Sequence, residues 1–273
     1  MPEFGIAEAP GMGLDGRERP SEDVVVALPD AAIVLDGAST LRTDLPSGGE
    51  YARELAAQLA GRLTAAPELD LVGHLAGAIR SVARHNGFTP GESPSSTVSI
   101  VRWDESTVEA LVLCDSPVAA FLADAVEVVA DDRLRDLPRG PYRERLARGE
   151  GYGPGHYEAL RSSGDRFDRW RNVDGGFWVA EAVPAAARQA VRASWPRADV
   201  RSVLMATDGV SCGVDDYGIF TWESMRELAA SAGPQAVLDA VRAAEKSDPD
   251  GSRWPRVKRH DDQALVYLDF MTA

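Results

Sequence analysis

The sequence has 273 residues, of which 44% are apolar and six are tryptophan, enough for a packed core and too apolar for wholesale disorder. Its formal net charge of −14 excludes ordinary nucleic-acid binding, which depends on surplus Lys and Arg. No segment has the roughly 20 apolar residues of a membrane span, and residues 1–20 lack a signal-peptide pattern. We therefore expect a cytoplasmic protein with no membrane partner, in which Cys114 and Cys212 are reduced.

The first half of the chain predicts a short hairpin followed by two helices. Residues 1–20 are rich in Gly, Pro and charge and predict an irregular lead-in. Two apolar runs, 24–28 and 31–35, predict a tight hairpin or two successive strands. Apolar residues recur about every four positions over 51–63 and 71–82, so each of these segments predicts an amphipathic helix with one buried stripe.

The second half predicts an antiparallel meander, an insertion and a mixed C-terminal part. Short β-branched runs between 96 and 130 indicate the meander. Residues 131–176 are rich in arginine and predict either a flap over the active site or a solvated helical insertion. Helices that are segregated from antiparallel strands are typical of an α+β fold, and we expect one domain over 1–273. The later elements are predicted as strands at 177–180, 203–207 and 264–270 and helices from about 184, near 221–231 and at 234–246.

Acidic residues lie where the predicted strands begin or end. They are Glu22, Asp23, Asp36, Asp115, Asp208, Asp261 and Asp262. Carboxylates at strand ends project beyond the edge of a sheet, where several of them can converge. Asp36 and Asp208 are each followed by a glycine, which lets the backbone approach an ion closely. Asp-Gly is also a common turn dipeptide, so each pair taken singly fits an ordinary turn equally well.

Converging carboxylates predict a divalent metal site. They cannot all stay ionised in one pocket without cations, and oxygen ligands without His or Cys select hard ions such as Mg²⁺ and Mn²⁺. Two such ions about 3.5–4 Å apart can lower the pKa of a shared water toward about 7, and the resulting metal-bridged hydroxide can attack phosphorus in line. The ions would also supply the positive charge that an acidic protein needs to bind a phosphate.

With these residues in place, the chain resembles the protein phosphatase 2C family of metal-dependent serine/threonine phosphatases. The resemblance runs in order along nearly the whole chain. It is carried by Ser21–Asp23 (N-E-D in the family), Val34–Gly37 (D-G-H-G), Ser95–Val98 (G-S/T-T-A), Leu113–Ser116 (G-D-S), Met205–Gly209 (S/T-D-G-L) and Asp261–Ala264 (D-N/D-x-T). It implies a four-layer α/β-β/α sandwich, in which two packed antiparallel sheets are flanked by helices.

The resemblance also implies roles for the acidic residues. Asp36 would bridge two metal ions, and the carbonyl of Gly37 would complete one site. Asp208 and Asp261 would hold the other ion, so Asp36, Asp208 and Asp261 form the predicted catalytic set.

Three further acids and an arginine complete the implied site. Glu22 and Asp23 would act through metal-bound waters, and Asp115, together with Asp208, could bind a third ion. The substrate phosphate would be bound by Arg17 or Arg19, neither of which stands in perfect register with the arginine of the family.

Three departures from the family pattern indicate a divergent bacterial subgroup. Ala38 stands where the family has a histidine often assigned as general acid, Cys114 replaces the glycine of G-D-S, and Pro117 stands where an arginine is frequent. The basic run Arg253–His260 before Asp261 either offsets the acidic site, orients a phosphate or is a surface loop.

The resemblance implies hydrolysis of phosphoserine or phosphothreonine in a protein substrate by a monomer with two bound Mn²⁺ or Mg²⁺ ions. A phosphatase for a small phosphorylated metabolite and a catalytically weak pseudophosphatase that binds a phosphoprotein are the alternatives on the same fold. Gly209–Gly213 also matches the G-x-S-x-G elbow of serine hydrolases, with Ser211 as nucleophile and His260 downstream, but the antiparallel meander disfavours that fold.

Overall fold

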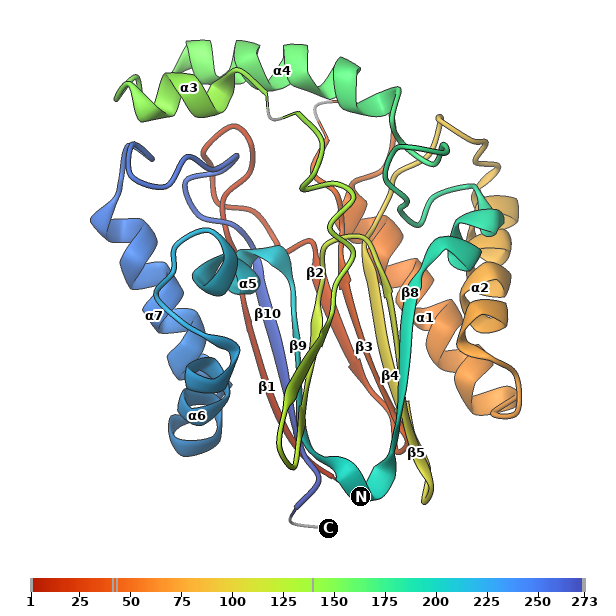
Figure 1. Cartoon of the computed structure of the whole chain (residues 1–273). Coiled ribbons are helices and arrows are strands. Elements are labelled where there is room, and N and C mark those ends of the chain that lie inside the picture. The colour runs from red at the N-terminus through yellow and green to blue at the C-terminus, as the bar shows by residue number, and fades with distance from the viewer. Residues whose placement is uncertain (1, 41, 43, 139, 272–273) are drawn as a thin grey trace.

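The computed structural model describes residues 2–40, 42, 44–138 and 140–271, and within them two five-stranded antiparallel sheets lie face to face (Figure 1). The strands are β1 (Glu3–Ala9), β2 (Asp23–Ala27), β3 (Ala31–Asp36), β4 (Val98–Trp103), β5 (Thr107–Leu113), β6 (Val118–Leu122), β7 (Val126–Val129), β8 (Val191–Pro196), β9 (Val200–Ala206) and β10 (Gln263–Asp269). One sheet has the order β1-β10-β9-β6-β7 and the other β2-β3-β4-β5-β8.

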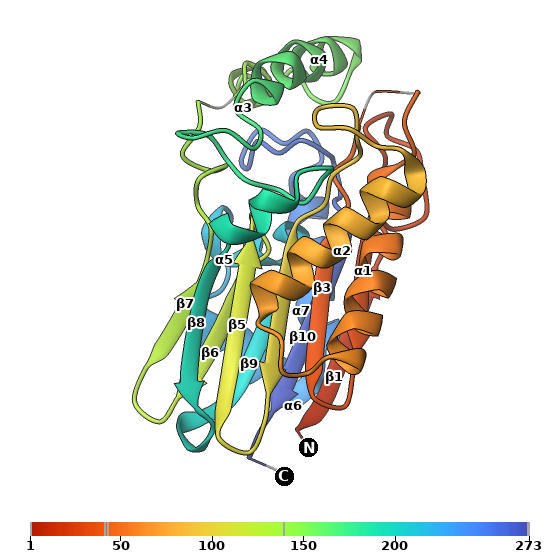
Figure 2. The same cartoon turned by 90° about the vertical axis from the view of Figure 1, so that its right-hand side faces the viewer.

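Helices cover the outer faces of both sheets (Figures 1 and 2). The helices α1 (Gly48–Ala65) and α2 (Leu71–Asn86) pack on the β2–β3 side of the molecule, and α6 (Trp222–Ala232) and α7 (Pro234–Ser247) pack on the β1–β10 side. The predicted four-layer α/β-β/α sandwich is therefore confirmed.

Valine is the commonest residue in the layer between the two sheets. Val34 of β3 and Val101 of β4 belong to one fully buried cluster with Met205 of β9 and Val266 of β10. Burial of one such side chain contributes about 1.5–3 kcal/mol. The alternation of inward and outward residues also fixes the register of the strands, because a slip by one residue would turn the apolar set outward.

Local signals in the sequence define the helix ends. Helix α1 begins with a capping box, in which the Glu50 N–H donates to Ser47 Oγ at 3.2 Å and the Ser47 N–H donates to Glu50 Oε2 at 2.9 Å. Helix α2 begins at the N-cap Asp70 and ends at Gly87, whose φ of 70° lies in the left-handed region that favours glycine.

The predicted hairpin is present as β2 and β3, and the register of the two strands brings two acidic residues together. The antiparallel pairing places Asp23, the first residue of β2, opposite Asp36, the last residue of β3. Two acids that are 13 positions apart in sequence are thus neighbours at one end of the sandwich.

The prediction of an irregular lead-in over residues 1–20 is wrong for Glu3–Ala9, which form β1 and pair with β10. The strand lies at the edge of its sheet, and Ala7 is its one buried residue. An edge strand that buries so little apolar surface has a weak hydrophobic pattern, so its sequence resembles that of a loop.

The region between 177 and 200 also differs from the prediction. The expected strand at 177–180 consists of isolated bridges, such as that between Ala180 and Ser96. The helix expected from Pro184 is the 3₁₀ helix η1 (Pro184–Gln189), and a second one, η2 (Arg197–Asp199), precedes β9. Strand β8 was not predicted, because it is largely exposed and carries no apolar run.

The arginine-rich segment 131–176 contains the helices α3 (Tyr142–Ala147) and α4 (Pro154–Asp168), which lie across one end of the sandwich (Figure 1). Neither predicted alternative, the flap over the active site or the solvated helical insertion, is decided by these two helices alone. No helix within the described residues is both long and apolar enough to cross a membrane.

Candidate metal centre

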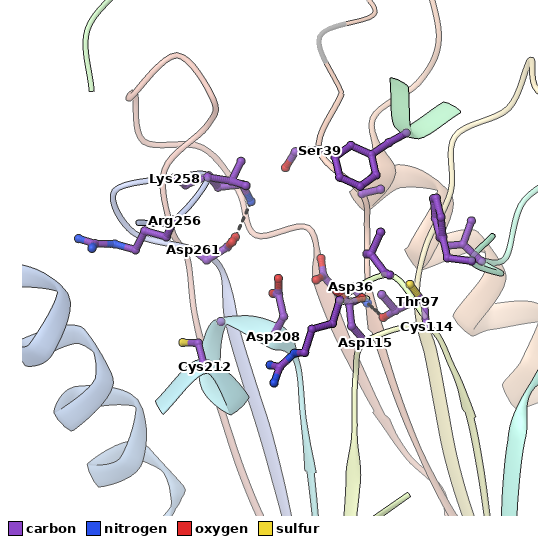
Figure 3. Close-up of a pocket in the computed structure, with 18 of the residues that line it drawn as sticks. Asp36, Ser39, Thr97, Cys114, Asp115, Asp208, Cys212, Arg256, Lys258 and Asp261 are labelled. Carbon is purple, nitrogen blue, oxygen red and sulfur yellow. Dashed lines mark hydrogen bonds and ion pairs between the residues drawn. The ribbon is translucent and has the colours of Figure 1, made fainter. Parts of the chain in front are cut away.

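The predicted acidic residues lie at the end of the sandwich below α3 and α4, although Glu22, Asp23 and Asp262 do not line the cavity found there. Because the strands are antiparallel, the starts of β2 and β10 lie at the same end as the finishes of β3, β5 and β9. Figure 3 shows Asp36, Asp115, Asp208 and Asp261 around a common pocket, and these four residues line a cavity of about 740 Å³. Residues of α3 and α4, among them Tyr142, line the same cavity.

Burial and mutual repulsion raise the pKa values of this cluster. The pKa of Asp36 lies well above its ordinary value because of burial and then the charges of Asp23 and Asp208. Burial, followed by the charges of Asp261 and Asp115, does the same for Asp208. The pKa of Asp23 is raised to about 8, mainly by burial. Without added cations these carboxylates therefore retain protons, as expected of acids that share one pocket.

One buried oxygen of Asp23 has no hydrogen-bond partner. The hydroxyl of Thr207 donates to Oδ2 of Asp23 at 2.8 Å, whereas Oδ1 is buried and unpartnered within the described residues. Unpartnered buried acceptors are rare in native proteins and indicate a missing water or ion. Oδ1 is thus a suitable acceptor for a metal ion or its bound water.

Asp36 is held in place by the segment predicted to resemble G-S/T-T-A. The Asp36 N–H donates to Thr97 Oγ1 at 3.0 Å, and the Thr97 N–H donates to the carbonyl of Asp36 at 2.9 Å. The Thr97 hydroxyl also forms a 2.6 Å hydrogen bond with the hydroxyl of Ser116. Thr97 therefore connects Asp36 at the end of β3 with the turn that carries Asp115.

The turn that carries Asp115 has a glycine-like backbone at Cys114. Cys114 has a φ of 69°, in the left-handed region that favours glycine. Its N–H donates to Asp131 Oδ2 at 3.0 Å, and Asp131 is in turn paired with Arg133 at 2.6 Å. These contacts offset the backbone strain and hold Asp115 at the cavity wall.

The glycines that follow Asp36 and Asp208 are required by close backbone packing. A Cβ on Gly37 would lie 2.2 Å from the carbonyl carbon of Gly48, and a Cβ on Gly209 would lie 1.9 Å from the carbonyl oxygen of Asp262. Gly37 therefore allows the end of β3 to contact the start of α1. Gly209, at the start of α5 (Asp208–Asp215), allows that helix to contact the segment before β10.

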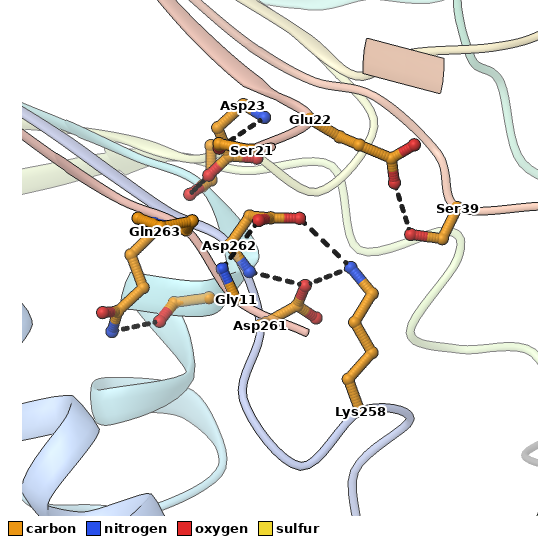
Figure 4. A network of polar contacts seen from close by, with 12 residues as sticks. Gly11, Ser21, Glu22, Asp23, Ser39, Lys258, Asp261, Asp262 and Gln263 are labelled. Carbon is orange, nitrogen blue, oxygen red and sulfur yellow. Dashed lines mark hydrogen bonds and ion pairs between the residues drawn. The ribbon is translucent and has the colours of Figure 1, made fainter. Parts of the chain in front are cut away.

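Two cations lie among the carboxylates, as Figure 4 shows for Lys258. Lys258 Nζ is 2.5 Å from Asp261 Oδ1 and 3.5 Å from Asp262 Oδ2. Burial alone would lower the pKa of Lys258, but the charges of Asp261 and Asp262 outweigh it and raise the pKa above its ordinary value. Lys258 is therefore an ammonium ion.

Arg19 is the second cation. Of the two arginines predicted to bind the substrate phosphate, it is the one that lies among the carboxylates. Its Nη2 lies 2.5 Å from Glu22 Oε2 and 3.1 Å from Asp262 Oδ2. Ser39 completes this contact by donating to Glu22 Oε2 at 2.6 Å. The Arg17 side chain, by contrast, is 86% exposed and pairs with Asp15.

The donor set fits hard divalent cations, although it is not preassembled as a cage. In the described part of the chain, no group of three or more His, Cys, Asp or Glu side chains is arranged to hold a metal ion as it stands. The oxygen-only donors, the raised pKa values and the unpartnered oxygen of Asp23 nevertheless match Mg²⁺ or Mn²⁺.

Sequence analysis singled out the D-D pair and the basic run, but it did not predict which side chains orient or pair with the carboxylates. Thr97 and Thr207 orient carboxylates, Asp262 pairs with both cations, and Lys258 engages Asp261. The D-D pair and the basic run before it were the available signals.

The alternative serine-hydrolase reading gains no support from this geometry. Ser211 is buried within α5, and the His260 ring pairs with Glu245 at 2.9 Å.

The fold is shared with known serine/threonine phosphatases. One of them is the catalytic domain of the phosphatase PstP, which was solved in complex with two manganese ions. Its sequence is 12% identical to this one, the TM-score is 0.57, and the alignment covers 98% of this chain and 97% of the PstP chain. Another is the PPM phosphatase MsPP from Mycobacterium smegmatis. Its sequence is 17% identical to this one, the TM-score is 0.56, and the alignment covers 98% of this chain and 97% of the MsPP chain.

A third structure agrees with these two. Stp1 from Staphylococcus aureus is 13% identical at a TM-score of 0.55, with 98% of this chain and 95% of that chain covered. No protein-family model and no curated protein matches the sequence significantly. The predicted resemblance to the protein phosphatase 2C family is thus confirmed for the fold, and this chain has the fold of the PPM-type serine/threonine phosphatases.

Proposed function

We propose that this chain is a member of the protein phosphatase 2C family and hydrolyses phosphate monoesters with the help of bound Mn²⁺ or Mg²⁺, with phosphoserine or phosphothreonine in a protein as its substrate class. The observation that carries this proposal is the convergence of Asp36, Asp115, Asp208 and Asp261 on one cavity of the phosphatase fold. Two bound ions would supply Lewis acidity, which lowers the pKa of water and offsets the charge of the phosphoryl oxygens.

The residues of the chain would divide this work among them. Asp36, Asp208 and Asp261 would hold the ions with the carbonyl of Gly37, and Asp115 would contribute to a third site. Glu22 and Asp23 would accept hydrogen bonds from bound waters, for which the free oxygen of Asp23 is suited.

Arg19 would bind the substrate phosphate. Arg19 lies at the cluster, whereas Arg17 points into solvent, so Arg19 is the better candidate.

The test is hydrolysis of p-nitrophenyl phosphate in the presence of Mn²⁺ by the wild type and the Asp36→Asn variant. Asn is isosteric with Asp but brings no negative charge, so we expect turnover to fall by about 10²–10³-fold, the usual cost of losing one key electrostatic group. Asp30→Asn is the matched control, because Asp30 is exposed in the turn at the other end of the same hairpin. Full activity of the Asp36 variant would refute the proposed site.

A small phosphorylated metabolite is the second candidate substrate, and the covered cavity favours it. At about 740 Å³ the cavity lies within the range of about 300–1,000 Å³ that is typical of small-molecule sites. Tyr142 of α3 and Leu160 of α4 line it together with the carboxylates, so these helices limit what can enter. A kcat/KM for phosphothreonine peptides far below that for small phosphate esters would identify the metabolite class.

The pseudophosphatase alternative rests on Ala38 and Cys114. Cys114 keeps the turn in a glycine-like conformation, so this replacement does not by itself argue against catalysis. Tight Mn²⁺ binding without hydrolysis of any phosphate ester would favour the pseudophosphatase.

A further inference from the structure

The chain contains two lysines, and one of them is buried in the carboxylate cluster. Lys246 is exposed near the end of α7, whereas the side chain of Lys258 is 6% exposed and lines the cavity. Burying a lysine is costly unless its charge is paired. Lys258 therefore lies in the cluster because the carboxylates stabilise its charge.

Lys258 engages a residue that the proposed function assigns to a metal ion. Its Nζ is 2.5 Å from Asp261 Oδ1, and the Asp262 N–H donates to the same oxygen at 2.9 Å. Asp262 is already engaged, since its Oδ1 accepts the Gly11 N–H and its Oδ2 pairs with Arg19. Figure 4 shows the ammonium of Lys258 in contact with both Asp261 and Asp262.

A divalent ion and this ammonium cannot share Asp261 without cost. The ion either displaces Lys258 from Oδ1 of Asp261 or binds beside it at Oδ2, and in both cases the two like charges repel each other across a short distance in a partly buried site. The repulsion falls mainly on the ion at Asp208 and Asp261. An ion held by Asp36 and Gly37 is less affected, because Asp36 lies farther from Lys258 than Asp261 does (Figure 3) and interacts with it more weakly.

We propose that Lys258 is an internal cation that competes for Asp261 and selectively weakens binding of the metal ion assigned to Asp208 and Asp261. This inference rests on the proposed metal-dependent function. It makes Lys258 a positioning residue, which sets how much Mn²⁺ is needed to fill both positions. The wild-type chain should accordingly bind one ion more tightly than the other.

The test is calorimetric titration of the metal-stripped chain with Mn²⁺ alone. Lys258→Met removes the charge and keeps an unbranched apolar side chain. We expect the dissociation constant of the weaker ion to fall by about tenfold or more, because a nearby like charge is removed, with little change for the tighter ion. Lys246→Met, at the exposed lysine, is the matched control and should bind as the wild type does. Lys258→Gln repeats the test with a polar side chain, in case the Met variant does not fold.

Each outcome bears on a distinct claim. Unchanged or weaker Mn²⁺ binding in both Lys258 variants would overturn the inference, and so would an unchanged affinity combined with a higher KM, which would make Lys258 a phosphate-binding residue. Mn²⁺-dependent hydrolysis by the wild type would leave the proposed function standing in either case. If the wild type bound no Mn²⁺, both the inference and the proposed function would be refuted.

Discussion

Replacing Asp23 with Asn should stabilise the metal-free protein at high pH and not at low pH. The pKa of Asp23 is raised from 3.8 to about 8, so the folded chain retains a proton that the unfolded chain releases above about pH 4. Stability is then lost as the pH rises from about 4 to about 8. At about 1.36 kcal/mol per pH unit, the interval from 3.8 to about 8 corresponds to about 6 kcal/mol, of which about 5 kcal/mol is lost by pH 8, where Asp23 of the folded chain is half ionised.

The amide that replaces the carboxylate in the Asp23→Asn variant offsets part of the stability gained at high pH. Its oxygen can accept the Thr207 hydroxyl as Asp23 does, but its NH₂ group takes the place of the unpartnered oxygen. An unpaired buried N–H costs about 1–3 kcal/mol. The variant should therefore be more stable than the wild type by about 2–4 kcal/mol at pH 8. At pH 5 the wild-type carboxylate costs only about 2 kcal/mol, which roughly equals the cost of the unpaired amide N–H in the variant, so the two proteins should be similarly stable.

The assay is urea unfolding in EDTA at pH 5 and pH 8. With a slope of about 2–3 kcal/mol per molar urea, the variant should unfold at a midpoint about 1 M higher than the wild type at pH 8. Saturating Mn²⁺ should reduce or reverse this difference, because bound ions stabilise the wild type. A difference that is the same at both pH values, or a variant that is less stable at pH 8, would refute the reasoning.

Three further predictions follow from single contacts. Thr97→Val removes the hydroxyl that accepts an N–H from the end of β3, so we expect a loss of about 1–3 kcal/mol in urea unfolding and lower turnover, whereas Thr97→Ser should retain both. Gly209→Ala places a methyl group 1.9 Å from the Asp262 carbonyl oxygen and should weaken Mn²⁺ binding. In the control variant Gly61→Ala, the new methyl group on α1 meets no atom within 4 Å, so this variant should be more stable by about 1 kcal/mol. The pKa of His74 is lowered by burial and by two nearby guanidinium groups, so stability should fall below about pH 6.5, and His74→Leu should reduce this acid sensitivity in thermal unfolding.

The layers of the fold could be predicted because their hydrophobic patterns are strong. The β2–β3 hairpin and helices α1 and α2 each bury a continuous apolar face, and these patterns are readable in sequence. Strand β1 could not be predicted, because Ala7 is its one buried residue and its partner β10 lies at the other end of the chain.

The candidate site was predictable in its carboxylates but not in its contacts. Strand ends that carry Asp36, Asp208 and Asp261 indicate convergence, since antiparallel strands bring such ends together. Which cation meets which acid depends on the path of the loop before β10. The pairing of Lys258 with Asp261 therefore required the structure, as did the choice of Arg19 over Arg17.

The most direct test of the proposed function is to strip the wild-type chain of metal and follow hydrolysis of p-nitrophenyl phosphate as Mn²⁺ is added back. We expect no turnover in EDTA, a rise that saturates with Mn²⁺, and loss of turnover when EDTA is restored, because the buried carboxylates need cations to assemble the site. Hydrolysis that is independent of the ion, or Mn²⁺ binding without hydrolysis of any phosphate ester, would contradict the proposal.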